Sequence, residues 1–263
     1  MGKTHFGTCC VCGKKGNMTF EHIPPRQANN EKQIKKILDP IGFFESEQKI
    51  DDKLQSVAYK LGNQKGMGGY TLCRGCNNFF GSKYATEFIT FYKELADFFA
   101  NHHDEIVTQS KNGYLDITLV ANINFFRFQK QVMSMLMSTS NGIYKESFKN
   151  YLLNEQNTDF PSENFKVIMN GYLDSSIVKQ TGQMLGINSS GTSEIVGSEI
   201  QVFPLGFTLV ELNGSENDRN NGIGLDITNW AKLEDCQQKR EFTLRTYIKS
   251  QPFSYYLTGV TPQ

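Results

Sequence analysis

The spacing of apolar residues between positions 83 and 103 predicts a long amphipathic helix. Large apolar side chains recur there at intervals of three and four residues: Phe88, Phe91, Tyr92, Leu95, Phe98 and Phe99. This spacing puts them on one side of an α-helix, which must be covered by a core. We expect the helix to end near His102, His103 and Asp104, because imidazole groups interact favourably with a helix C-terminus.

The next 50 residues predict a strand followed by two further helices. The segment 114–123 (YLDITLVANI) has the residue types of a strand. The segment 124–138 predicts a helix whose Phe and Met side chains enter the core, with Asn124 as its N-cap. The segment 144–156 also favours a helix.

From about residue 163 onward the chain favours strands. Three segments carry this preference: 165–173, 199–212 and 241–257. Together with the preceding helices they predict a mixed α+β body without internal repeats.

The first 80 residues predict shorter elements. A strand over 17–23 is expected to end at Pro24 and Pro25, because proline cannot donate to a sheet ladder. A second strand is expected at GGYTLC, before a helix that follows Cys76. Between them, 31–39 and 51–61 favour short helices, and the glycine-rich run 62–69 favours irregular structure.

Composition and charge narrow the class of protein. Hydrophobic residues make up 38% and charged residues 21% of the chain, as in soluble globular proteins. The sequence has neither an apolar run of about 18 residues nor a signal-peptide core, so we expect a cytoplasmic protein. Residues 1–85 hold 13 Lys and Arg against 7 Asp and Glu, and this excess of positive charge points to an anionic partner such as nucleic acid.

Four cysteines form two C-x-x-C pairs, Cys9 with Cys12 and Cys73 with Cys76. This spacing turns two sulfurs toward one ion, and two pairs supply the four thiolates of a closed structural zinc site. Gly13 permits the backbone twist that the first pair requires. Cys10 should point away from the ion as a free thiol. Sixty residues separate the pairs, against about 15 to 20 in simple zinc ribbons, so structure is expected between them.

In this order the motifs resemble the HNH endonuclease superfamily, the treble-clef or ββα-metal nucleases. The closest resemblance is to bacterial variants with the pattern C-x-x-C-G, E-H-x-P-P, C-x-x-C-N, and it covers about residues 7 to 90. The matching residues are Cys9, Cys12, Gly13, Glu21, His22, Pro24, Pro25, Cys73, Cys76 and Asn77. Bacterial relatives of this kind are often encoded in anti-phage defence systems or mobile elements.

The resemblance implies a role for each of three polar residues. Glu21 and Asn77 would hold a catalytic divalent cation, Mg²⁺ or Mn²⁺, and His22 would be the general base. These roles suit the side chains, because hard cations take oxygen ligands and imidazole accepts protons near neutral pH. The family has a further Asn a few residues before the third cysteine. Gly68 stands in that place here, and Asn63 or Gln64 are candidates to replace it.

Basic residues near these motifs are candidate contacts to the phosphate backbone of nucleic acid. They are Lys14, Lys15, Arg26, Arg74 and Lys83. Each one taken singly is also compatible with an ordinary solvated surface charge.

The sequence thus predicts an α+β protein with a zinc-bound HNH module over 1–90 and a mixed α+β domain over 91–263. The expected function is hydrolysis of phosphodiester bonds in nucleic acid, DNA in the first place. The second domain is a candidate for regulation, target binding or self-association. Two alternatives stay open: a zinc-containing nucleic-acid-binding module without catalysis, and a structural or interaction protein.

Overall fold

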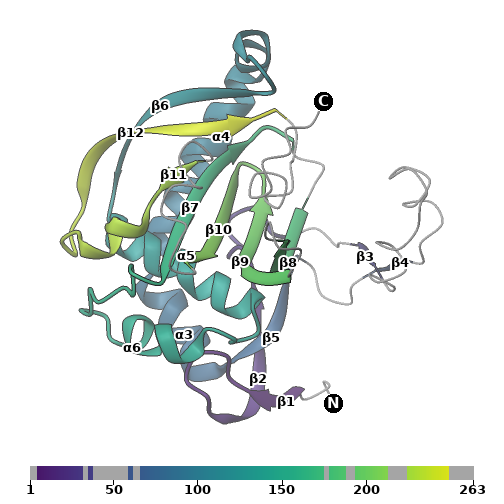
Figure 1. The fold of residues 1–263 in the computed structure, drawn as a ribbon, viewed down its shortest axis with the longest axis vertical. Helices are drawn as coiled ribbons and strands as arrows, with labels where there is room; N and C mark the ends of the chain where they lie inside the picture. The colour runs from purple at the N-terminus through teal and green to yellow at the C-terminus, as the bar shows by residue number, and fades with distance from the viewer. Residues whose placement is uncertain are drawn as a thin grey trace.

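The chain folds into a mixed α+β structure, as the sequence predicts (Figure 1). The computed structural model describes residues 5–31, 66–174, 197–212 and 224–248 in full, and the backbone of 35–37, 59–61, 178–187 and 193–196. No helix in these ranges is long and apolar enough to cross a membrane.

A small antiparallel sheet forms the N-terminal end of the molecule. Its strands, in the order β1-β2-β5, are β1 (His5–Thr8), β2 (Lys15–His22) and β5 (Gly68–Cys73). β2 ends at His22, directly before Ile23 and the two prolines, so the predicted end of this strand is confirmed. The pairing of β2 with β5 shifts register between Thr19 and Glu21, a β-bulge of the kind that re-aims side chains.

A larger sheet forms the body of the protein. It runs in the order β6-β12-β7-β10-β9-β8, with β11 paired to β7. The strands are β6 (Tyr114–Ile123), β7 (Phe165–Tyr172), β8 (Val178–Ile187), β9 (Ser193–Val202), β10 (Leu205–Glu211), β11 (Leu225–Asp226) and β12 (Gln238–Tyr247). The strand predicted over 199–212 is divided at Phe203–Pro204, where the chain turns and β10 pairs back onto β9.

Four α-helices connect and cover the two sheets in the described ranges. They are α3 (Arg74–Lys83), α4 (Ala85–Gln109), α5 (Phe125–Thr139) and α6 (Lys145–Leu153), and a 3₁₀ turn, η1, covers Thr228–Lys232. The predicted N-cap of α5 is confirmed, because the Asn124 carboxamide accepts a hydrogen bond from the Arg127 amide at 3.0 Å. α4 continues six residues past His103, although His102 itself has non-helical backbone angles.

One continuous core joins the small sheet to the body. Buried side chains from Cys9 through α4 and α5 to Leu244 in β12 belong to a single cluster. α5 is at its centre and packs against β5 of the small sheet and β9 and β10 of the large one. The domain boundary predicted at residues 90 and 91 falls inside α4, so the two regions share this helix.

The short helix predicted over 31–39 is wrong at its centre. Residues Lys35–Ile37 form strand β3, which pairs antiparallel with β4 (Tyr59–Leu61), the end of the second predicted helix. A helix of this length gains little stability by itself, so pairing with a distant segment overrides the local pattern. Asn63 and Gln64 lie outside the described residues.

Candidate metal and phosphodiester site

The four cysteines of the two C-x-x-C pairs come together at one end of the small sheet. Cys9 and Cys12 lie in the turn between β1 and β2, Cys73 precedes the first residue of α3, and Cys76 is in its first turn. Their Sγ atoms all lie within 4.8 Å of one another. Tetrahedral zinc with bonds of about 2.3 Å needs sulfurs separated by about 3.8 Å, and Cys12 and Cys73 Sγ lie 3.7 Å apart.

The backbone around the first pair has the predicted twist. Gly13 adopts a φ of 75°, which favours glycine, and its amide donates to the Cys9 carbonyl at 3.0 Å. Cys10 is buried away from the cluster, with its Sγ 3.7 Å from the Ser138 hydroxyl. Cys10 is therefore a free thiol, as predicted.

The charge state of the thiols favours a cation at their centre. Donation from the Cys76 thiol lowers the pKa of Cys9 to about 4, and the same bond, together with burial, raises the pKa of Cys76 far above its ordinary value. Burial also raises the pKa of Cys12. One thiolate thus opposes the ionisation of its neighbours, and a positive ion between them allows all four to ionise. The donor set fits a metal ion such as zinc.

Glu21 is a buried carboxyl group at the other end of β2. It is 6% exposed, and it accepts hydrogen bonds at Oε2 from the hydroxyls of Ser138 on α5 and Thr71 on β5. Burial raises the pKa of Glu21 to about 8, because these two hydrogen bonds offset only part of the cost of desolvating the charge. A divalent cation bound to this carboxylate would reverse that effect.

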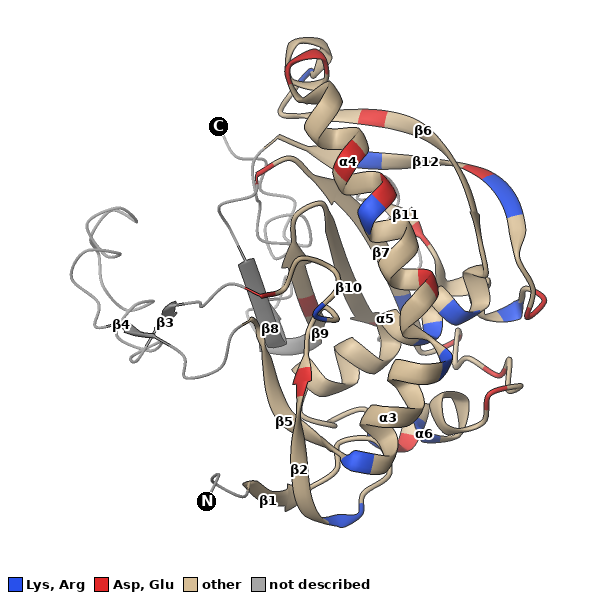
Figure 2. Ribbon diagram, turned by 180° about the vertical axis from the view of Figure 1, so that it is seen from behind, with Lys and Arg blue, Asp and Glu red and all other residues tan. Residues whose placement is uncertain are grey.

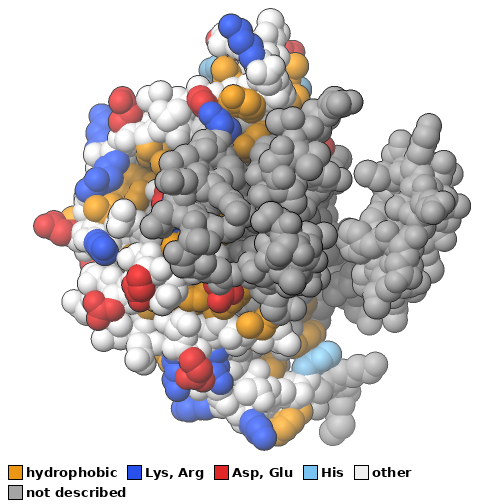
Figure 3. All heavy atoms as spheres, viewed as in Figure 1, with side chains coloured by type: hydrophobic (Ala, Val, Ile, Leu, Met, Phe, Trp, Pro, Cys, Tyr) orange, Lys and Arg blue, Asp and Glu red, His pale blue; other side chains and the backbone are white. Residues whose placement is uncertain are grey.

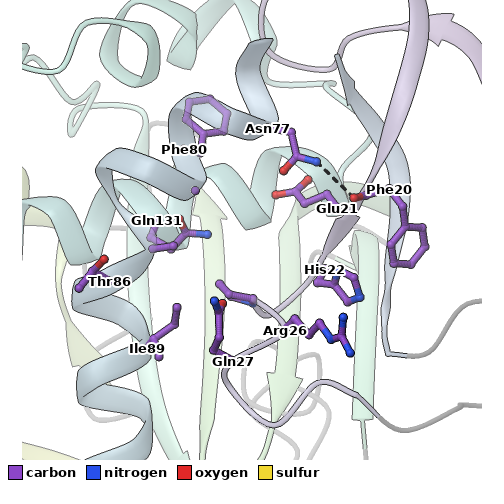
Figure 4. Close-up of a pocket in the computed structure, with 13 residues that line it drawn as sticks. Phe20, Glu21, His22, Arg26, Gln27, Asn77, Phe80, Thr86, Ile89 and Gln131 are labelled. Carbon is purple, nitrogen blue, oxygen red and sulfur yellow. Dashed lines mark hydrogen bonds between the residues drawn. The ribbon is translucent and has the colours of Figure 1, made fainter. Parts of the chain in front are cut away.

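Glu21 shares a pocket of about 320 Å³ with His22, Asn77 and Arg26. The Asn77 amide nitrogen donates to the Thr19 hydroxyl at 3.0 Å and to the Phe20 carbonyl at 3.2 Å. Figure 4 shows the Asn77 amide oxygen on the side of the Glu21 carboxylate. Two oxygen acceptors that face each other in a pocket open to solvent are a suitable pair for a hard cation.

His22 is the last residue of β2 and leaves the strand on the side opposite Glu21 (Figure 4). Its ring packs edge-on against Phe20, with 5.0 Å between centroids, and is half-buried. The structure therefore places the imidazole at the pocket rim beside Arg26.

Of the five basic residues singled out in the sequence, only Arg26 lines the pocket, and its guanidinium is 3.3 Å from Glu31. Lys14 and Lys15 lie at the cysteine end of the sheet, about 20 Å from His22 along β2, and Arg74 follows Cys73, which pairs with Met18, about 13 Å from His22 along the same strand. Lys and Arg positions are blue on the ribbon at this end of the molecule in Figure 2, and their side chains are blue in Figure 3. Lys83 forms an ion pair of 2.9 Å with Glu155, so its ammonium group already has a partner within the protein.

Gly68 cannot be replaced by the Asn that the family has near this position. A Cβ atom at Gly68 would lie 1.8 Å from the Glu21 carbonyl oxygen, because β5 approaches the end of β2 closely here. The requirement for glycine is steric, and it fixes the position of the Glu21–His22 backbone.

Asn30 is a residue that the sequence reasoning missed. It is 9% exposed, and its amide nitrogen donates to the carbonyls of Pro24 at 2.6 Å and Met67 at 2.8 Å. Its Oδ1 accepts from the Met67 amide. Asn30 therefore ties the segment after His22 to the start of β5. An Asn five residues after a proline pair gives a weak signal in a sequence, because many loop asparagines are solvated.

Replacing Asn30 by alanine should lower the free energy of unfolding by about 2 kcal/mol, since it leaves the Pro24 carbonyl and the Met67 amide without partners, whereas the Met67 carbonyl keeps the bond that it accepts from the Ile23 amide. Urea unfolding measures the loss. Asn78→Ala, at an exposed position of α3, is the matched control and should change it by less than about 0.5 kcal/mol. Equal stabilities of the two variants would contradict this role for Asn30.

The chain matches no protein-family model, no curated protein and no solved structure. The site geometry and the chemistry of its residues are therefore the basis for a functional assignment.

Proposed function

We propose that the protein is a zinc-stabilised endonuclease of the HNH type that hydrolyses phosphodiester bonds of nucleic acid, DNA in the first place. One observation carries the proposal: the cluster of four thiols and the pocket with Glu21, His22 and Asn77 are built on the same strands and helix. Strands β2 and β5 are antiparallel and α3 follows β5, with Cys9 and Cys12 in the turn before β2 and Cys76 in the first turn of α3. This order of elements supports the ββα arrangement that the resemblance implies.

The pocket residues have the chemistry that hydrolysis requires. A divalent cation such as Mg²⁺ or Mn²⁺, when bound, stabilises charge on the phosphoryl and leaving oxygens. The Glu21 carboxylate and the Asn77 amide oxygen would hold this cation. His22 takes a proton from the attacking water at its imidazole nitrogen, and Arg26 at the rim pairs with a backbone phosphate.

Replacing Glu21 by glutamine should weaken the binding of Mn²⁺ to the zinc-loaded protein at least tenfold, because an amide oxygen carries no net charge. Titration calorimetry measures the change. The variant keeps the size of the side chain and a hydrogen-bonding group for Ser138, so it should fold. Unchanged Mn²⁺ affinity would remove Glu21 from the metal site.

The stability of the wild-type protein should depend on pH through Glu21, and the same variant should lack this dependence. Without a divalent cation in the pocket, the raised pKa of about 8 means that folded Glu21 keeps a proton that the unfolded chain has released above its ordinary value of 4.5. Stability should therefore fall as pH rises from 4.5 to 8, by about 3 kcal/mol at pH 7. Urea unfolding of wild type and Glu21→Gln should show this slope only in the wild type. Parallel pH profiles would contradict it.

Incubation of the purified protein with supercoiled plasmid and Mg²⁺ or Mn²⁺ tests the function. The proposal expects nicked and linear products that depend on the added ion. Binding of the plasmid without cleavage would favour a non-catalytic nucleic-acid-binding module. The absence of both would favour a structural or interaction protein.

A further inference from the structure

Gln131 is a buried polar residue that the proposed chemistry does not use. It lies on α5 in the body of the protein, is 4% exposed and lines the same pocket as Glu21. Its Oε1 atom is buried and has no hydrogen-bond partner in the part of the chain that the structure describes. A buried amide oxygen without a partner is costly, which makes this side chain a candidate for contact with a ligand.

The position of Gln131 separates it from the proposed metal ligands. Ser138, which holds the Glu21 carboxylate, is two helical turns further along α5. Two turns correspond to about 10 Å along the helix axis. Gln131 is therefore outside the coordination sphere of an ion at Glu21 and suits a part of the substrate next to the reacting phosphate.

The surroundings of Gln131 suit a flat group with a polar edge. Phe80, Ala85 and Ile89 supply apolar walls from α3 and α4. Figure 4 shows the amide ends of Gln27 and Gln131 pointing into the same space. The volume of about 320 Å³ is at the lower end of the range for small-molecule sites.

We propose that this pocket receives one unpaired nucleobase of the substrate, whose hydrogen-bonding edge meets the side-chain amide of Gln131. This inference rests on the proposed nuclease function and specifies its substrate: nucleic acid with an unpaired or extruded nucleotide beside the cleaved bond. A glutamine amide offers a donor and an acceptor together, which pair with the donor and acceptor on a base edge. Enzymes that extrude a base hold it in this way, between apolar side chains and polar groups.

Binding of three fluorescent DNA duplexes to full-length protein tests the proposal. One duplex is fully paired, one carries a single unpaired nucleotide, and one carries an abasic residue at the unpaired position. His22→Ala protein with Mg²⁺ keeps the strands intact during the measurement. We expect the unpaired nucleotide to tighten binding at least tenfold over both other duplexes, and Gln131→Leu in the same protein to reduce this preference below threefold.

Thermal unfolding shows whether Gln131→Leu loses only its contact with the base or is also destabilised. Gln131→Leu removes an unpaired oxygen and should leave the melting temperature unchanged or raised. Gln129→Leu, two residues away, is the matched control: Gln129 donates to the Thr228 carbonyl and accepts from the Tyr151 hydroxyl, so its loss should lower the melting temperature.

Three outcomes would overturn the base pocket: equal affinity for all three duplexes, a preference that survives in Gln131→Leu, or a destabilised Gln131→Leu protein. If the plasmid is still cleaved, only the base pocket fails. If the protein neither binds nor cleaves nucleic acid, the proposed function fails with it.

Discussion

Replacing His22 by alanine should lower the rate of DNA cleavage by a factor of about 10² to 10⁴, the usual effect of removing a general base. His22 is the histidine that lines the pocket with Glu21 and Asn77. A water in this pocket has no second imidazole to give its proton to within the described residues, because His5, His102 and His103 do not line it. The rate of nicking of supercoiled plasmid at saturating Mg²⁺ measures the effect.

His103→Ala is the matched control for this experiment. His103 is exposed on the last part of α4 and contacts Asp104, so its loss should leave the cleavage rate unchanged. Both variants should keep one zinc and remain folded, since neither histidine belongs to the thiol cluster. If His22→Ala retains the wild-type rate, another group takes the proton and the assignment of His22 is wrong.

Replacing Cys73 by serine should have the largest effect on stability. The wild-type protein should bind one zinc ion per chain through Cys9, Cys12, Cys73 and Cys76. Structural zinc contributes about 10 to 16 kcal/mol of apparent binding free energy in small zinc domains, and serine is a poor replacement for a thiolate ligand. The variant should therefore lose most of its zinc and melt at a lower temperature or fail to fold.

The Cys73→Ser substitution should disturb the pocket around Glu21 as well as the binding of zinc. Cys73 is the last residue of β5 and adjoins α3, so it connects the thiol cluster to the strand that pairs with Glu21. Cys236→Ser is the control, because Cys236 is exposed and outside the cluster. Elemental analysis and thermal unfolding measure both variants. Full zinc content in Cys73→Ser would show that the four sulfurs do not share one ion.

Much of the fold could be predicted because several segments have strong local signals. The helix that starts after Asn124 and the strand over 114–123 have the bounds that the residues indicate. The thiol cluster could also be predicted, because a C-x-x-C pair fixes local geometry whatever the distance to the second pair. The short segments around 35–37 and 59–61 could not, since their pairing depends on contacts between residues far apart in the sequence.

The sequence did not predict that residues of α5 would contribute to the pocket around Glu21. The helix over 124–138 looks like a one-sided core helix, yet the structure buries nearly every side of it. Lys130 is wholly buried and donates to the carbonyls of Tyr151 and Asn154 at the end of α6. Gln131 and Ser138 lie on the face toward Glu21. Gln131 and Ser138 are seven residues apart, which places them on one side of the helix, but other polar residues such as Gln129 and Ser134 lie between them, so the sequence does not single out this pair.

Anomalous diffraction from crystals of the zinc-loaded protein soaked in Mn²⁺ tests the central claim most directly. The account predicts a zinc peak among the four sulfurs and a manganese peak in the pocket, within coordination distance of a Glu21 carboxylate oxygen and the Asn77 amide oxygen. Manganese bound elsewhere, or no manganese in a pocket that retains its zinc and its fold, would contradict it.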